Sequence, residues 1–165
     1  MQQPNYLILD GAKMRFDLDK AKELNVNHQC LYKGKSAINL GGVAPWLFTF
    51  QKGAPFANWF AENSPEKSWG ILFHSEDAFE TVYKHLRKFL LVKTEEEKEL
   101  YFRYYDPRVL NTFMPSCDGR QLADFFGPIK AFYAETQPNK GLLYTFDEIN
   151  KELESAIITW SKILK

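Results

Sequence analysis

Cysteine, histidine and excess charge of one sign are scarce in this 165-residue sequence. The two cysteines, Cys30 and Cys117, lie far apart and form neither a disulfide framework nor a metal-knuckle spacing, which favours a reducing compartment. The three histidines, His28, His74 and His85, are not spaced like the zinc ligands of a metalloprotease helix. Because 21 basic side chains balance 21 acidic ones, nothing global draws the chain to nucleic acid or to an acidic membrane.

Long apolar runs are missing as well. No segment approaches the length of a membrane-spanning helix. The first five residues contain no basic region followed by an apolar stretch, so we expect no signal peptide. These absences predict a cytoplasmic protein without a membrane partner, and the length fits a single domain over residues 1–165.

Motifs of the common enzyme classes are also absent. There is no nucleophile elbow and no phosphate-binding glycine loop, and the pair Gly41-Gly42 lacks the third glycine of a dinucleotide site. The triplet His74-Ser75-Glu76 invites an acid–base interpretation, but a helix cap at Ser75 also explains the acidic residues that follow it. We therefore expect no catalytic residues, no metal site and no cofactor.

Aromatic residues, by contrast, are abundant, and the stretch Leu100–Leu110 combines them with paired charges. The alternation over 100–105 predicts a strand, and the next two residues, Asp106 and Pro107, suit the N-cap and first position of a helix. Arg103 and Arg108 flank this aspartate. The charges either form a structural ion pair that fixes a strand-to-helix corner or belong to a polar catalytic site.

Periodicity and turn residues predict an α+β fold: a mixed, largely antiparallel sheet with packed helices and a helical carboxyl-terminal part. Expected strands cover residues 6–9, 46–50, 69–73 and 91–92, the last pairing with 100–105, whereas 141–146 is either a strand or an extended connection. Expected helices cover 17–24, 56–63, a segment capped by Ser75 with apolar residues from Phe79 to Leu90, 107–113, 118–126 up to Gly127-Pro128, and 147–165 capped by Asp147.

Two of these predicted helices offer candidate partner-binding residues. The apolar stripe of the helix over 147–165 either docks on its own domain or faces another protein. Five residues of the two helices are the candidate anchors: Ile157, Trp160 and Leu164 on this helix, and Trp59 and Phe60 on the helix over 56–63.

Taken together, the motifs resemble the effector adaptors of bacterial type VI secretion, the family called Tap or TEC. The resemblance spans residues 6–133, and its most specific part is the Arg-Tyr-Tyr-Asp-Pro-Arg run followed by Phe-Phe-Gly-Pro. The matching segments are Leu7–Ala12, Pro45–Leu47, Ser68–Ile71, His85–Arg87, Phe89–Val92, Phe102–Leu110, Gln121 and Phe125–Ile129.

The resemblance implies a non-enzymatic adaptor that binds a toxic effector protein in the cytoplasm and promotes its loading onto the VgrG spike. Many members continue into a longer carboxyl-terminal lobe, so the effector contacts of that lobe are expected to be absent here, reduced, or moved onto residues 147–165. The motif residues would be architectural: Asp10, Arg103, Asp106, Pro107, Arg108, Gly127 and Pro128.

Two alternatives remain open. One is an immunity protein that neutralises a toxin. The other is a small enzyme in which Asp10, Arg103, Asp106 and Arg108 converge in an open pocket, whereas an adaptor would keep them partly buried and paired with one another.

Overall fold

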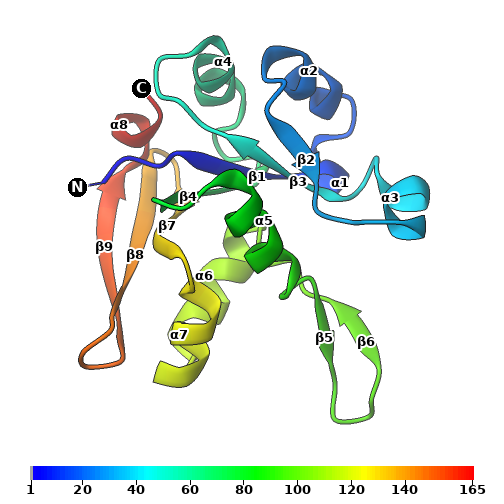
Figure 1. Ribbon diagram of the computed structural model, residues 1–165. Coiled ribbons are helices and arrows are strands. Elements are labelled where there is room, and N and C mark those ends of the chain that lie inside the picture. Colours follow the sequence, from blue (N-terminus) through cyan, green and yellow to red (C-terminus); the bar gives the residue numbers. More distant parts are fainter. Residues whose placement is uncertain (1) are drawn as a thin grey trace.

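A seven-stranded antiparallel sheet forms the centre of the protein in a computed structural model that describes residues 2–165 (Figure 1). Helices pack on both faces, and a separate two-stranded hairpin, β5–β6, extends from the body. The predicted α+β class is confirmed. The sheet strands are β1 (Tyr6–Asp10), β2 (His28–Cys30), β3 (Pro45–Thr49), β4 (Gly70–Ser75), β7 (Ile129–Gln137), β8 (Lys140–Asp147) and β9 (Glu152–Thr159); the hairpin strands are β5 (Leu91–Lys93) and β6 (Glu99–Tyr101).

The sheet order is β2-β3-β1-β4-β7-β8-β9, and all neighbouring strands are antiparallel. The interior strand β1 is buried on both faces, as its apolar sequence predicts. Tyr6 and Ile8 belong to one core, and Leu7 and Leu9 belong to the other. Gly70 begins β4 where the chain passes close to β1, since a β-carbon there would lie 1.9 Å from the carbonyl oxygen of Ile8.

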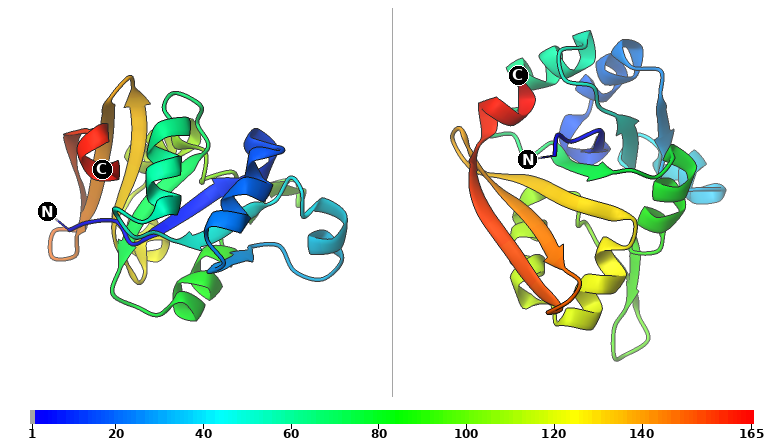
Figure 2. Two further views of the ribbon diagram at one scale, coloured as in Figure 1. Left: turned by 90° about the horizontal axis from the view of Figure 1, so that it is seen from above. Right: turned by 60° about the vertical axis from the view of Figure 1, so that its left-hand side comes forward.

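The helices divide between these two cores. Helices α5, α6 and α7 cover one face of the sheet, and α1, α2, α4 and α8 cover the other (Figures 1 and 2). Their bounds are α1 (Gly11–Met14), α2 (Asp17–Leu24), α3 (Lys35–Leu40), α4 (Pro55–Asn63), α5 (Phe79–Arg87), α6 (Pro107–Ser116), α7 (Gly119–Phe126) and α8 (Trp160–Leu164). The predicted helix over 17–24 is confirmed with the same bounds, and the one over 118–126 differs only in that Asp118 is its N-cap.

The predicted strand over 100–105 is wrong beyond Tyr101. The pairing of β5 with β6 is as expected, but the chain leaves the hairpin after Phe102, whose N–H donates to the carbonyl of Leu90. It then turns so that Tyr104 enters the core, where its hydroxyl donates to the carbonyl of Leu86 at 2.8 Å. Burial of this ring, rather than strand pairing, determines the local path.

Ser75 is not a helix cap, contrary to the sequence prediction. It is the last residue of β4, and α5 begins at Phe79 with no side-chain cap. Its hydroxyl donates to the carbonyl of Pro128 at 2.8 Å and accepts from the N–H of Asp77 at 3.1 Å. The serine therefore links the end of β4 to the chain that enters β7.

The predicted carboxyl-terminal helix over 147–165 is also wrong. Strand β9 pairs with β8 along its whole length, and only the short α8 is helical. Asp147 instead caps a turn, accepting from the N–H groups of Ile149 and Asn150. The four-residue spacing of Ile149, Leu153 and Ile157 fits a helix, but four is also twice the two-residue period of a strand.

Candidate functional site

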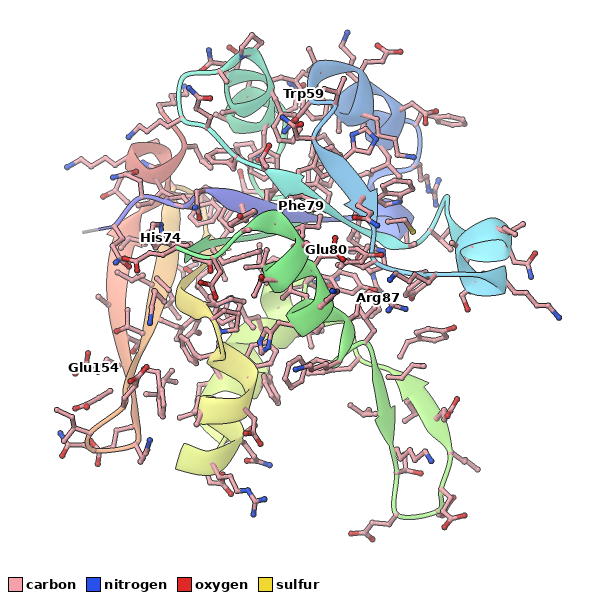
Figure 3. The ribbon with its side chains drawn as sticks, in the orientation of Figure 1. Trp59, His74, Phe79, Glu80, Arg87 and Glu154 are labelled. Carbon is pink, nitrogen blue, oxygen red and sulfur yellow. The ribbon has the colours of Figure 1, made fainter. Side chains whose placement is uncertain are left out.

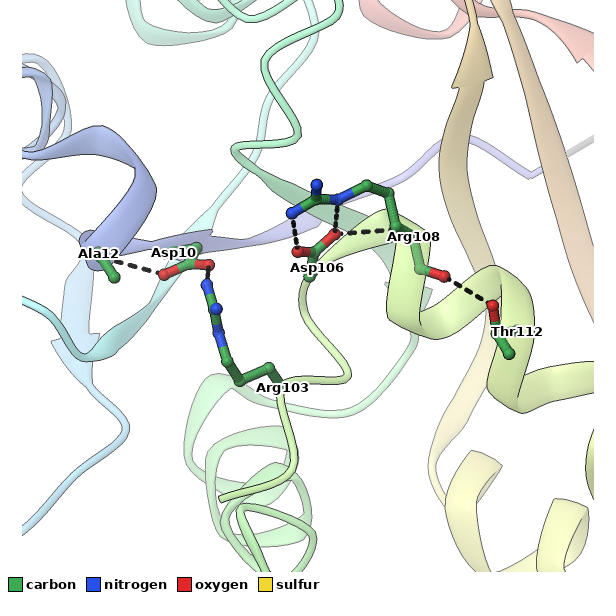
Figure 4. A network of polar contacts seen from close by, with 6 residues as sticks. All are labelled: Asp10, Ala12, Arg103, Asp106, Arg108 and Thr112. Carbon is green, nitrogen blue, oxygen red and sulfur yellow. Dashed lines mark hydrogen bonds and ion pairs between the residues drawn. The ribbon is translucent and has the colours of Figure 1, made fainter. Parts of the chain in front are cut away.

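Two ion pairs lie side by side where β1, α1 and the start of α6 meet (Figure 4). Asp10 ends β1 and caps α1, accepting from the N–H of Ala12 at 3.0 Å. The guanidinium of Arg103 donates to the other oxygen of this carboxylate. One buried side chain thus ends a strand, begins a helix and holds a segment 93 residues away.

The second pair is local. Asp106 caps α6, accepting a hydrogen bond from the backbone N–H of Arg108 at 2.9 Å. Its carboxylate also accepts from Nε of the Arg108 side chain at 3.1 Å and from Nη2 at 2.8 Å. Burial raises the pKa of Asp106, but the hydrogen bonds from Arg108 outweigh this effect and hold the pKa below its ordinary value. The same contacts raise the pKa of Arg108.

In both ion pairs the aspartate is buried and the arginine is partly exposed. Asp10 and Asp106 are buried, whereas the side chains of Arg103 and Arg108 are 42% and 64% exposed. Among residues 2–165, every buried side-chain nitrogen or oxygen has a hydrogen-bond partner. The pairing and partial burial expected of an architectural motif are therefore present, but as two separate pairs rather than two arginines on one aspartate.

The other three motif residues also hold elements together. Pro107 occupies the first turn of α6 and is buried. Gly127 ends α7 with a φ of +49° and packs against the ring of His85. Pro128 provides the carbonyl that accepts from Ser75.

An open depression of about 610 Å³ lies beside the ion pairs along α6. Arg103, Asp106 and Arg108 border it together with Val109, Thr112, Phe113 and Ser116, but Asp10 does not. Both carboxylates accept hydrogen bonds from guanidinium groups. What this surface offers to another molecule is the exposed part of two guanidinium groups beside a helix face that mixes apolar and hydroxyl side chains.

Three of the five predicted anchors are buried. Phe60, Trp160 and Leu164 lie in the core between the sheet, α4 and α8, so the prediction that they face a partner is wrong in this fold. Trp59 is half-buried (Figure 3), with its ring stacked on Trp69 at 5.6 Å. Ile157 is 80% exposed, but on a strand.

The hairpin β5–β6 is a surface that the sequence predictions did not treat as a site. It extends away from the body in Figure 1 and in the right-hand view of Figure 2. Four of its apolar side chains are between 41% and 52% exposed: Leu91 and Tyr101 as one cross-strand pair, and Val92 and Leu100 as the other. Successive pairs point to opposite faces, so the hairpin is apolar on both sides. The apolar residues on both faces of the predicted hairpin are the sequence signal that marks it as a candidate binding surface.

At the base of the hairpin, a small hollow joins it to the body. Tyr101 packs on Tyr32 with ring centroids 5.3 Å apart, and Arg87 donates to the carbonyl of Leu31 at 2.9 Å. Leu91 lines the same hollow. An isolated two-stranded hairpin is marginal in water, so these contacts orient it.

No group of three or more His, Cys, Asp or Glu side chains that could hold a metal ion occurs within residues 2–165. In the same range, no helix is both long enough and apolar enough to cross a bilayer.

Comparison with known proteins gave one match. A family model described as "Domain of unknown function (DUF4123)" matches residues 5–124, from the start of β1 to within α7. No curated protein and no solved structure matched the chain.

Proposed function

The chain belongs to the DUF4123 family, and from that membership we propose that it is a non-enzymatic adaptor of type VI secretion. In this proposal it binds a toxic effector protein in the cytoplasm and promotes its loading onto the VgrG spike. The proposal rests on the resemblance of residues 6–133 to Tap/TEC adaptors, most of which coincides with the matched region.

The observation that carries the proposal is the β5–β6 hairpin. It lies within the family-matched residues and holds four partly exposed apolar side chains on one extended element. Exposed apolar surface gathered on one projecting element is typical of protein-binding sites. The ion pairs support the same conclusion, because their carboxylates are occupied in holding β1, α1 and α6 together.

The size of this surface suits reversible binding. Covering the exposed half of one such side chain is worth about 1 kcal/mol, and association itself has an entropic cost. Four side chains alone give a modest complex. An adaptor that releases its effector after loading requires such an interface.

A capture experiment in the native host tests the proposal. The tagged protein should retain a large toxin and a VgrG protein, both identified by mass spectrometry. The double variant Val92→Ser/Leu100→Ser removes one apolar pair of the hairpin and should reduce the capture of at least one of them. Phe16→Ser is the matched control, because Phe16 is 90% exposed and lies at the turn before α2, away from the hairpin.

Recovery of neither an effector nor a spike protein from wild type contradicts the proposal. Equal capture by the hairpin variant and by wild type removes its structural basis. If the bound toxin is instead neutralised, cells that carry this gene survive a toxin challenge, and the immunity alternative replaces the adaptor.

A further inference from the structure

The outer edge of β9 is the long unpaired edge of the sheet. In the strand order, β9 has β8 as its only neighbour, and it is eight residues long, whereas β2 at the other edge has three. The right-hand view of Figure 2 shows β9 outermost in the twisted ribbon of β7, β8 and β9. Such an edge presents free N–H and C=O groups to any extended chain.

The register identifies which groups are free. The N–H of Trp160 donates to the carbonyl of Asn139 on the side of β8. Because backbone groups alternate along a strand, residues 152, 154, 156 and 158 also face β8. The N–H and C=O groups of Leu153, Ser155, Ile157 and Thr159 therefore point outward.

Proline, lysine and β-bulges, three of the usual protections against strand addition, are missing from this edge. Strand β9 contains no proline and no lysine, and its pairing with β8 has no bulge, unlike the pairings of β4 with β7 and of β7 with β8. The side chain of Ile157 is 80% exposed beside the free edge. Two acidic side chains, Glu152 and Glu154, occupy the first half of the strand, on the opposite face from Ile157.

We propose that β9 accepts an extended segment of the effector as an additional strand of the sheet. Cross-strand partners share a face, so the residue opposite Ile157 would be apolar and β-branched. Those opposite Glu152 and Glu154 (Figure 3 shows Glu154) would be lysine or arginine. At the other end of β9, Lys140 of β8 lies in register with Thr159. Its positive charge disfavours a cation of the partner opposite Thr159, so the basic residues of the partner are expected only at the end beside Glu152 and Glu154.

This inference rests on the proposed function for the identity of the partner. Strand β9 lies beyond residues 5–124, so it belongs to a part of this chain that the family model does not describe. A strand outside the family-matched region is a suitable place to distinguish one effector from another.

A second copy of this chain is the competing occupant. Two β9 strands paired about a two-fold axis would leave Glu152 and Glu154 of both copies without a cationic partner from β9, which has no lysine or arginine. The charge pattern therefore favours a partner with basic residues.

The test uses a synthetic probe. One peptide alternates lysine with valine over eight residues, and its control replaces each lysine with glutamate. Residue-specific amide hydrogen exchange of the full chain is measured with each peptide. We expect the lysine peptide to slow exchange at Ser155, Ile157 and Thr159, and the glutamate peptide to have no effect.

Two variants test the edge itself. Ile157→Pro removes an outward N–H that makes no bond within the sheet, and Ile157→Lys adds an edge charge, so both should fold and both should weaken peptide binding about tenfold. Ile149→Lys is the control, because Ile149 is 91% exposed but lies in the turn before β9. It should bind the peptide like wild type.

Lack of protection along β9, or equal binding of the two peptides, overturns the proposal. Protection of the same amides that grows with protein concentration in the absence of peptide assigns the edge to a second copy instead. If the host captures an effector but the edge variants retain it, the edge proposal fails and the adaptor function stands. If the lysine peptide binds β9 but the host captures neither an effector nor a spike protein, the edge accepts strands and the adaptor function fails.

Discussion

The imidazole ring of His85 lies directly against the α-carbon of Gly127. A β-carbon at Gly127 would be 2.3 Å from Cε1 of the ring, and the φ of Gly127 is +49°, where residues with side chains are strained. Nε2 of His85 lies 2.7 Å from the carbonyl of Phe125, to which it donates. The contact joins the last turn of α5 to the carboxyl end of α7.

Gly127→Ala should lower the free energy of unfolding by about 3 kcal/mol, because left-handed strain and the clash with His85 add together. Urea denaturation of the single variant, of His85→Ala and of the double variant measures the coupling. We expect the double variant to be less unstable than the sum of the two single changes. Full additivity would mean that the ring and the glycine do not interact.

His85 should also make stability depend on pH. Burial lowers its pKa below the ordinary value of 6.5, and the nearby Lys88 acts in the same direction, although the bond to Phe125 opposes them. The unfolded chain therefore binds a proton at a higher pH than the folded one. Stability is fully present above about pH 6.5 and is lost as the pH falls toward the lowered folded pKa. His85→Gln can donate to the same carbonyl without titrating, so its unfolding free energy should change less between pH 7.5 and 5.5. Equal slopes for variant and wild type would contradict this assignment.

The two arginines should differ in their effect on stability. Arg103→Met leaves the carboxylate of Asp10 buried with Ala12 as its backbone donor, and we expect a loss of about 2 to 3 kcal/mol. Arg108→Met should cost only about 1 kcal/mol, because the Arg108 side chain is the more exposed of the two and solvent screens its ion pair more strongly. Thermal unfolding of both variants provides the comparison. A larger loss for Arg108→Met would show that exposure does not rank these pairs.

Alanine substitutions at Trp160 and at Ile157 should have very different effects on stability. Trp160 is buried between α4 and the sheet, so Trp160→Ala should cost about 3 to 5 kcal/mol. Ile157→Ala should change stability by less than about 0.5 kcal/mol, because its side chain is exposed. Chemical denaturation of each variant decides the matter. A stable Trp160→Ala protein would restore this tryptophan as a candidate partner contact.

Local chemistry was readable from the sequence where one short segment determines the structure. The cap at Asp106 needs only a neighbouring backbone N–H group, and it is present. The sequence predicts that Asp10, Arg103, Asp106 and Arg108 act together, but it does not predict which arginine pairs with which aspartate. Whether Arg103 pairs with Asp10 or with Asp106 depends on how β1 meets α6, which no local pattern encodes.

The largest error came from a spacing shared by two structures. Residues four apart fall on one side of a helix and also on one face of a strand, so the segment over 147–165 was assigned to a helix. The eight-residue pairing with β8 decides for the strand. Its β-branched residues Ile157, Ile158 and Thr159 are the local signal that favours a strand.

The position of β1 has a consequence for biosynthesis. It leaves the ribosome before both of its partners, since it lies between β3 and β4, which follow about 40 and 65 residues later. Until both have emerged, a strand with four successive apolar residues stays unpaired in the nascent chain, where it is prone to aggregate. Assembly of this sheet is therefore expected to begin with long-range closure, which slows folding and makes the growing chain a natural client of ribosome-associated chaperones.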